Sequence, residues 1–230
     1  MSVNVVSVHP AFDELLGGGL LPGVLTHVYG PPSSGKTNFA LIASVAAARM
    51  GKVVYVDAER GFSAERLRQI AGEKTEDTLR NILLIKPTTF EEQKVALSKV
   101  SDLVAAGGVS LVVVDSIALL YRLEEERDIR EFGRMLAKLL RIARKYEVPV
   151  LALNQVYTDH DSGKVIPVGG GINEYWSKIM LEAGVADDGT RSLILRKHVH
   201  KPAGLRVDYR ITNHGIELVE YSFASYDGGR

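Results

Sequence analysis

The chain has 230 residues, 46% hydrophobic and 24% charged, which is typical of one folded domain with a sizeable core. Its 28 lysines and arginines balance 28 aspartates and glutamates, so affinity for a polyanion would have to come from a local patch. Cysteine is absent, which excludes disulfides and thiolate metal sites, and no signal segment or membrane-spanning apolar run is present. We therefore expect a single domain over residues 1–230, cytoplasmic and without membrane contact.

Short runs of valine, isoleucine and leucine alternate with helical patterns along the first two thirds of the chain, which is typical of a parallel α/β sheet. The runs are residues 26–29, 53–56, 82–85, 111–114 and 150–153. The run 111–114 is apolar throughout, as in a strand with both faces covered by helices. Helices are predicted over residues 36–50, after the capping box that begins at Thr89, and over residues 129–146.

The last third of the chain has a different composition and pattern. Residues 156–174 are polar and rich in glycine, and predict a mobile loop. From Ile179 onward, apolar runs separated by turn residues predict hairpins that extend one edge of the sheet. The predicted fold is therefore α/β, with a mostly parallel central sheet, helices on both faces and a C-terminal antiparallel extension.

A phosphate-binding pattern, G-x-x-x-x-G-K-[ST], lies directly after a predicted strand and directly before a predicted helix. Its residues are Gly30, Pro31, Pro32, Ser33, Ser34, Gly35, Lys36 and Thr37. The glycines let the backbone wrap so that amides and the helix N-terminus face phosphates, while Lys36 supplies charge and the Thr37 hydroxyl can ligate Mg²⁺. This context favours ATP with Mg²⁺ over the alternative, a strand–helix turn with an incidental lysine.

Acidic and amide residues follow three of the predicted strands. Asp115 has the arrangement of a Walker B acid that holds Mg²⁺ through water, although an aspartate at this position could instead cap a helix. Glu59 is the candidate for orienting the attacking water; the alternative is a surface acid paired with Arg60 or Arg66. The amide of Asn154 or Gln155 could contact the γ-phosphate and move the loop that follows, or could simply end a strand.

Five segments together resemble the RecA/RadA recombinase family in order and spacing, over nearly the whole chain. They are Leu15–Gly19, Gly30–Thr37, Tyr55–Phe62, Leu111–Ser116 and Asn154–Val156. The resemblance implies a RecA-type P-loop core in which Lys36 and Thr37 bind Mg-ATP and Asp115 is the Walker B acid. It also implies that Glu59 is the catalytic glutamate and Gln155 the nucleotide sensor.

Two DNA-facing loops are also implied by the resemblance, over residues 122–130 and 156–174. The first contains three consecutive acids from Glu124, and the second offers Lys164 as its only full cation, near Tyr157 and His160. Lysine and arginine contacts to phosphate dominate DNA affinity. We therefore expect both loops to bind DNA weakly.

A basic segment near the C-terminus also resembles the family, in which the equivalent stretch meets nucleotide across a subunit interface. Its residues are Lys197, His198, Val199, His200 and Lys201. If the strand continues through it, the histidines lie on one face and the lysines on the other. The lysines would then contact DNA or ATP phosphate in an assembly, or alternatively guard a solvated edge strand. No metal other than Mg²⁺ is expected, because two histidines without further ligands make a poor site.

The function expected from these features is that of an ATP-binding, DNA-binding accessory protein of homologous recombination and DNA repair with a weak DNA-linked ATPase. The chain resembles a short recombinase paralogue, without the N-terminal domain and the phenylalanine–alanine linker motif that build filaments. Expected partners are DNA, preferably single-stranded, a recombinase such as RadA, and a second copy in a homo-dimer. The alternatives are an active strand-exchange recombinase and a KaiC-like signalling ATPase without a DNA role.

Overall fold

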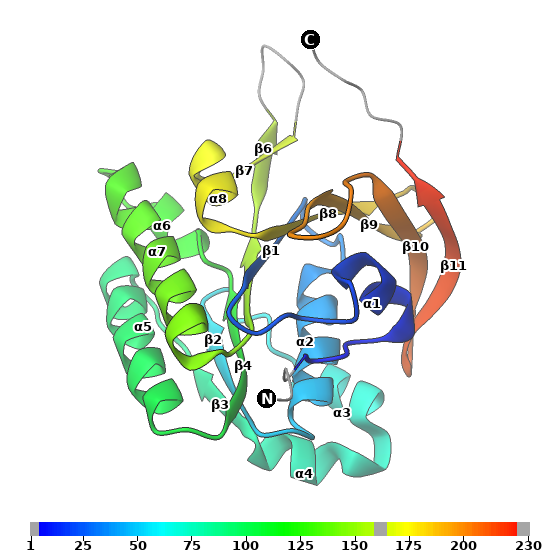
Figure 1. Cartoon of the computed structure of the whole chain (residues 1–230), viewed down its shortest axis with the longest axis horizontal. Coiled ribbons are helices and arrows are strands. Elements are labelled where there is room, and N and C mark those ends of the chain that lie inside the picture. The colour runs from blue at the N-terminus through cyan, green and yellow to red at the C-terminus, as the bar shows by residue number, and fades with distance from the viewer. Residues whose placement is uncertain (1–4, 159–164, 225–230) are drawn as a thin grey trace.

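A nine-stranded sheet forms the centre of the computed structural model, which describes residues 5–158 and 165–224 (Figure 1). Its strand order is β11-β10-β9-β8-β1-β5-β4-β2-β3. The strands are β1 (Leu25–Tyr29), β2 (Lys52–Asp57), β3 (Ile82–Ile85), β4 (Val109–Asp115), β5 (Val150–Asn154), β8 (Ile179–Val185), β9 (Arg191–Lys197), β10 (Leu205–Thr212) and β11 (Gly215–Phe223). Strands β1 to β5 and β8 pair in parallel, whereas β8 to β11 form the antiparallel extension. The predicted fold class is confirmed.

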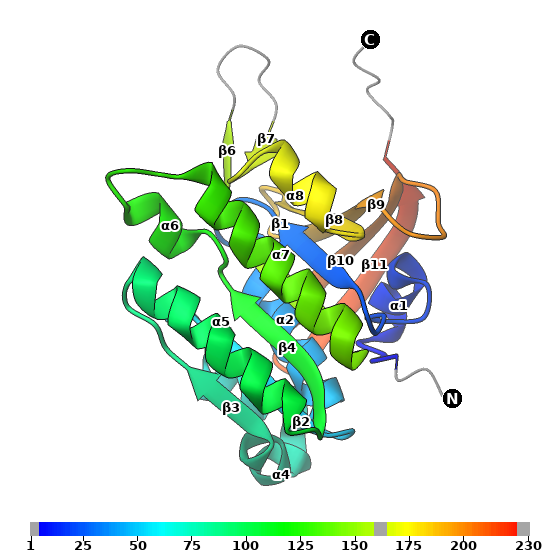
Figure 2. The ribbon, with the colours of Figure 1, turned by 60° about the vertical axis from the view of Figure 1, so that its left-hand side comes forward.

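Helices cover both faces of this sheet, as Figures 1 and 2 show. They are α1 (Pro10–Leu16), α2 (Lys36–Ala47), α3 (Ala64–Ala71), α4 (Thr75–Arg80), α5 (Phe90–Ala105), α6 (Leu119–Leu123), α7 (Ile129–Tyr146) and α8 (Gly171–Trp176), with a 3₁₀ turn at Gly72–Lys74. Successive side chains of β4 lie on opposite faces of the sheet. Leu111 and Val113 belong to the hydrophobic core with α1 to α3, and Val112 and Val114 belong to the core with α5 and α7. Two covered faces therefore account for the uniformly apolar strands.

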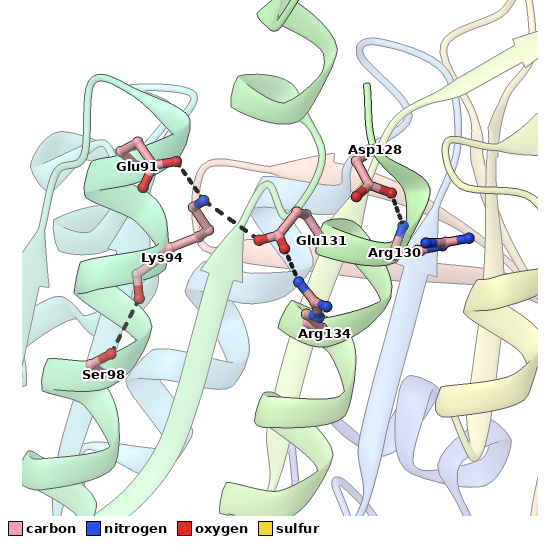
Figure 3. Close-up of polar contacts among 7 residues, drawn as sticks. All are labelled: Glu91, Lys94, Ser98, Asp128, Arg130, Glu131 and Arg134. Carbon is pink, nitrogen blue, oxygen red and sulfur yellow. Dashed lines mark hydrogen bonds and ion pairs between the residues drawn. The ribbon is translucent and has the colours of Figure 1, made fainter. Parts of the chain in front are cut away.

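One ion pair joins α5 to α7 near the start of α7, in addition to their apolar contact (Figure 3). Lys94 of α5 lies between Glu91 and Glu131, and its distance to Glu131 is 3.5 Å. Glu131 also pairs with Arg134 on the next turn of α7. Partly exposed pairs of this kind stabilise a protein by about 0–1 kcal/mol each, so the buried apolar face holds the helices together and the charges add orientation.

The segment 156–174 is more regular than its composition predicts. Strands β6 (Val156–Thr158) and β7 (Val165–Pro167) form an antiparallel hairpin, and α8 follows. Side-chain amides support this segment, since Asn173 within it and Asn154 before it both donate to the Val168 carbonyl at 2.8 Å. The prediction of an unpacked loop is therefore wrong for these parts. Lys164 and His160 lie outside the described residues.

Two further differences concern element ends. Helix α2 ends at Ala47, three residues before the predicted end. In the predicted capping box, the Glu92 carboxylate bonds the backbone amide of Thr88 and not that of Thr89. Thr89 accepts the Glu92 amide as a cap should, whereas the Glu92 carboxylate accepts from Thr88. In the described part of the chain, no helix has the length and apolar character needed to span a membrane.

A pair of glycine substitutions tests how α8 is attached. Gly169 has φ +93° and an added Cβ would lie 2.4 Å from the Phe132 ring, whereas Gly171 has open space around it. We expect Gly169→Ala to lower the free energy of unfolding by about 1–3 kcal/mol through backbone strain and overpacking. Gly171→Ala, at the start of α8, is the control and should change it by less than about 0.5 kcal/mol. Equal effects in urea denaturation would contradict this account.

Candidate nucleotide site

The loop between β1 and α2 is shaped by two glycines that other residues cannot replace. A Cβ on Gly30 would lie 2.2 Å from the Ala183 carbonyl oxygen of the neighbouring β8. Gly35 has φ +92° and precedes α2 with no side chain bonded to the first-turn amides. Those amides and the positive end of the helix are therefore available to an anion.

Lys36 lies inside this loop with only 8% of its surface exposed. Its Nζ donates to the carbonyl oxygens of Gly30 and Pro31, both at 2.8 Å. Burial lowers the pKa of Lys36, and the negative charges of Glu59 and Asp115 oppose that shift. The ammonium thus sits where phosphate oxygens would replace the carbonyl oxygens.

Asp115 ends β4 and is 1% exposed. Its Oδ2 accepts from the Thr37 hydroxyl at 2.8 Å and from the Tyr55 hydroxyl at 2.9 Å. Burial raises the pKa of Asp115 to about 6, against the lowering effect of these hydrogen bonds. Helix α6 begins only at Leu119, so Asp115 does not act as the helix cap that remained the alternative.

The space beside Thr37 and Asp115 suits a small cation. A Cβ on Gly61 would lie 3.5 Å from Thr37 Oγ1 and 3.8 Å from Asp115 Oδ2, so glycine keeps this position open. Hydroxyl and carboxylate oxygens are ligands that Mg²⁺ prefers, and a divalent cation would favour the ionised form of the buried acid. The residues present therefore fit a Mg²⁺ ion bound together with nucleotide phosphates.

Glu59 and Gln155 meet at the same edge of the sheet. Gln155 Nε2 donates to Glu59 Oε1 at 2.9 Å, and Gln155 Oε1 accepts from the Arg122 guanidinium at 2.7 Å. Arg66, one of the two surface partners that the sequence left open for Glu59, instead binds the carbonyls of Thr212 and Gly215. The amide of Gln155 thus joins the candidate catalytic acid to Arg122, which lies on α6 at the start of the predicted first DNA-facing loop.

Two other polar residues at these strand ends, Asp57 and Asn154, hydrogen-bond to the backbone and stabilise the local structure. Asp57, which is fully buried, accepts the backbone amides of Gly61 at 2.9 Å and Phe62 at 3.3 Å and so holds the turn that presents Glu59. Asn154 points inward to Val168. Of the two amides that the sequence offered as a phosphate contact, Gln155 is therefore the one placed at the site.

The basic segment differs from its prediction. Strand β9 ends at Lys197, so no strand alternation separates the histidines from the lysines. His198 Nδ1 accepts the backbone amides of His200 and Lys201, while its Nε2 lies 3.1 Å from the Leu16 carbonyl oxygen. Lys201 is paired with Glu14 at 2.8 Å. Lys197 donates to the Glu174 carbonyl. The segment therefore ties β9 to α1 and α8, because its polar groups find partners within the chain.

Three contributors to the site were missed at the level of sequence. Tyr55 and Gly61 were read only as part of a family motif, and Arg122 only as the start of a loop. A tyrosine in an otherwise apolar buried strand needs a partner for its hydroxyl, which was a usable signal for Tyr55. No local pattern could pair Arg122 with Gln155, because 33 positions separate them in the chain.

The raised pKa of Asp115 predicts how stability depends on pH. A carboxyl group whose pKa is raised on folding stabilises the folded state at low pH, and this contribution is lost as pH rises through about 4 to 6. Asp115→Asn, which lacks the charge, should therefore gain stability relative to the unsubstituted protein by up to about 3 kcal/mol between pH 4 and pH 7. Thermal unfolding of nucleotide-free and metal-free protein measures this, and a difference independent of pH would contradict it.

Comparisons with known proteins show the family of this chain. A profile described as Rad51 matches residues 2–217. The DNA repair and recombination protein RadB of Methanosphaera stadtmanae is 37% identical over 220 residues, covering 92% of this chain and 95% of that protein. The RadB protein of Thermococcus kodakarensis is 43% identical over 216 residues, covering 91% and 97%.

A solved structure leads to the same group. The crystal structure of the RadB recombinase matches with a TM-score of 0.81 at 42% identity, covering 92% of this chain and 97% of that one. The chain therefore belongs to the Rad51/RecA family, as a RecA-like recombinase paralogue of the RadB group of DNA repair and recombination proteins.

Proposed function

We propose that this protein binds Mg-ATP at the β1–α2 loop and that the bound nucleotide controls its affinity for DNA, in an accessory role in homologous recombination and repair. The observation that carries the proposal is the meeting of five side chains that follow or end four parallel strands, β1, β2, β4 and β5. They are Lys36, Thr37, Glu59, Asp115 and Gln155. Their chemistry covers phosphate charge, metal ligation, water orientation and a polar sensor.

Each residue has a defined task in this proposal. Mg²⁺, when bound, would neutralise the charge that develops on the phosphate groups. Lys36 would exchange the Gly30 and Pro31 carbonyls for phosphate oxygens, and Thr37 and Asp115 would hold the metal. Glu59 orients the attacking water.

Gln155 is the proposed link between nucleotide and DNA. It lies between β5 and β6 and bonds both Glu59 and Arg122. A γ-phosphate that recruits the Gln155 amide releases both partners at once. The hairpin β6–β7 and the first loop then respond together, which is a coupling between two sites through one side chain.

An accessory role is favoured over that of an independent strand-exchange recombinase by the charge of the first loop. The loop has four acids, among them the exposed Glu125 and Glu126, against three arginines, and one of these, Arg122, is bound to Gln155. Hydrolysis is expected to be slow. The proposed partners are single-stranded DNA, a RadA-type recombinase and a second copy of this chain. Efficient joint-molecule formation by this chain alone would favour the recombinase alternative.

A signalling ATPase without a DNA role is the other candidate function. Its discriminating property is salt dependence, since binding through phosphates weakens steeply as salt is added. DNA affinity that responds neither to salt nor to ATP would favour this alternative.

Lys36→Ala tests the nucleotide site. Without the ammonium we expect ATP affinity to fall at least about 10-fold, because a charge-assisted contact to phosphate is lost. The ATP effect on DNA binding should disappear, while DNA affinity without nucleotide stays unchanged. Lys99→Ala, an exposed lysine on α5, is the control. Fluorescent-nucleotide titration and DNA anisotropy measure both quantities, and unchanged ATP affinity in Lys36→Ala would refute the proposal.

Gln155→Ala tests the coupling separately. The variant should bind ATP nearly as well as the unsubstituted protein, yet the ratio of DNA affinities with and without ATP should fall from about 5-fold or more to about 1. Gln69→Ala, at an exposed position of α3, is the control. An undiminished ratio in Gln155→Ala would show that another element carries the signal.

A further inference from the structure

A surface groove lies between α7 and α8, separate from the nucleotide site. Two adjoining hollows of about 380 and 680 Å³ share Leu140, Arg144 and Trp176 in their walls. We call this surface the α7–α8 groove, lined by Arg141, Arg144, Lys145, Tyr175, Trp176 and Lys178. Figure 2 shows α8 lying beside the middle of α7.

The floor of the groove is apolar and aromatic. Gly133 allows α8 to approach α7, since a Cβ there would lie 2.5 Å from Ile172 Cδ1 and 3.8 Å from Trp176 Nε1. Tyr175 stands edge-to-face against Trp176 with ring centroids 4.9 Å apart, and it is 71% exposed. The groove thus presents a large aromatic ring to solvent beside a second, partly covered one.

The rim of the groove is positive. Arg141, Arg144 and Lys145 lie on consecutive turns of α7, and Arg141 and Lys145 are about 6 Å apart along the helix axis. In residues 5–158 and 165–224, no ion pair involves any of these three or Lys178. Glu174 is the one acid in the walls. In a chain of zero net charge, this is a local cationic surface.

We propose that the α7–α8 groove binds single-stranded nucleic acid, with phosphates on Arg141, Arg144 and Lys145 and unpaired bases stacked on Tyr175 and Trp176. A cationic track beside exposed aromatic rings is the combination that such strands require, because every base has a face that can stack. An acidic peptide would use the cations but not the rings. The inference rests on the proposed function only for the choice of a nucleic acid as ligand.

The position of the groove supports this assignment. Helix α8 begins four residues after the end of β7, and Figure 2 shows the β6–β7 hairpin next to the start of α8, which contributes Gly171 to the groove. The first loop carries acids, and the described residues of the hairpin, 156–158 and 165–167, include no lysine or arginine. The groove therefore provides cations near the hairpin, whose described residues include none.

The test removes charge and stacking separately. In Arg141→Gln/Arg144→Gln/Lys145→Gln, we expect affinity for a 20-nucleotide oligothymidine to fall about 100-fold at low salt. The slope of log K against log salt should become shallower by about 2, from three contacts at about 0.7 each. Tyr175→Ala should weaken binding about 10-fold with an unchanged slope, since stacking releases no counterions. Fluorescence anisotropy over a salt series measures both.

Controls separate the groove from general charge and from the nucleotide site. Arg68→Gln/Lys74→Gln/Arg80→Gln removes three exposed cations on the α3–α4 side and should leave affinity and slope unchanged. The groove variants should bind ATP like the unsubstituted protein. If oligothymidine binding does not respond to ATP but falls in the groove variants, the proposed function fails and the groove stands.

Three outcomes would overturn the groove assignment. They are an unchanged salt slope in the triple α7 variant, full affinity in Tyr175→Ala, and competition by polyglutamate as strong as that by oligothymidine of equal charge. The last result would mark the groove as a surface for acidic proteins. Weak competition by polyglutamate supports the assignment.

Discussion

A carboxylate buried at the end of a central strand is the constraint on which the site depends. Asp115 lies level with Asp57 in the parallel register of β2 and β4, where little water can solvate either charge. Asp57 is satisfied by backbone amides, whereas Asp115 depends on two hydroxyl donors and remains unfavourable as an anion. The buried carboxylate destabilises the protein without ligand, and a bound cation would remove this cost. Binding sites commonly lose stability in this way in exchange for function.

The same edge of the sheet shows how one side chain can serve two regions. Gln155 follows the central strand β5 and precedes the hairpin, so its backbone belongs to a rigid element on one side and to a peripheral one on the other. Its amide has a donor end and an acceptor end, and the structure uses them on Glu59 and Arg122. A ligand that binds either end of the Gln155 amide would therefore change its contacts with both Glu59 and Arg122, and this change requires no larger rearrangement of the core.

The location of the charged residues matters more in this protein than their net charge, which is zero. Opposite charges cancel over the chain, and several cations are bound internally, as when Lys36 lies in its loop and Lys201 pairs with Glu14. Arg141, Arg144, Lys145 and Lys178 have no ion pair among the described residues. Net charge therefore says little about where a polyanion would bind, since local field strength depends on unpaired groups.

Sequence alone determined the elements whose causes are local. Strand runs, the glycines of the phosphate loop and the apolar face of α7 each depend on neighbouring residues, and the structure places them where the patterns predict. Asp115 and Glu59 were identifiable because parallel strands end at a common edge. Tertiary structure alone decided which partners meet: Arg122 with Gln155, Tyr55 with Asp115, and His198 with Leu16. It also decided that Val156–Thr158 and α8 are regular, because Asn173 and Phe132 stabilise them through contacts that a polar, glycine-rich pattern does not reveal.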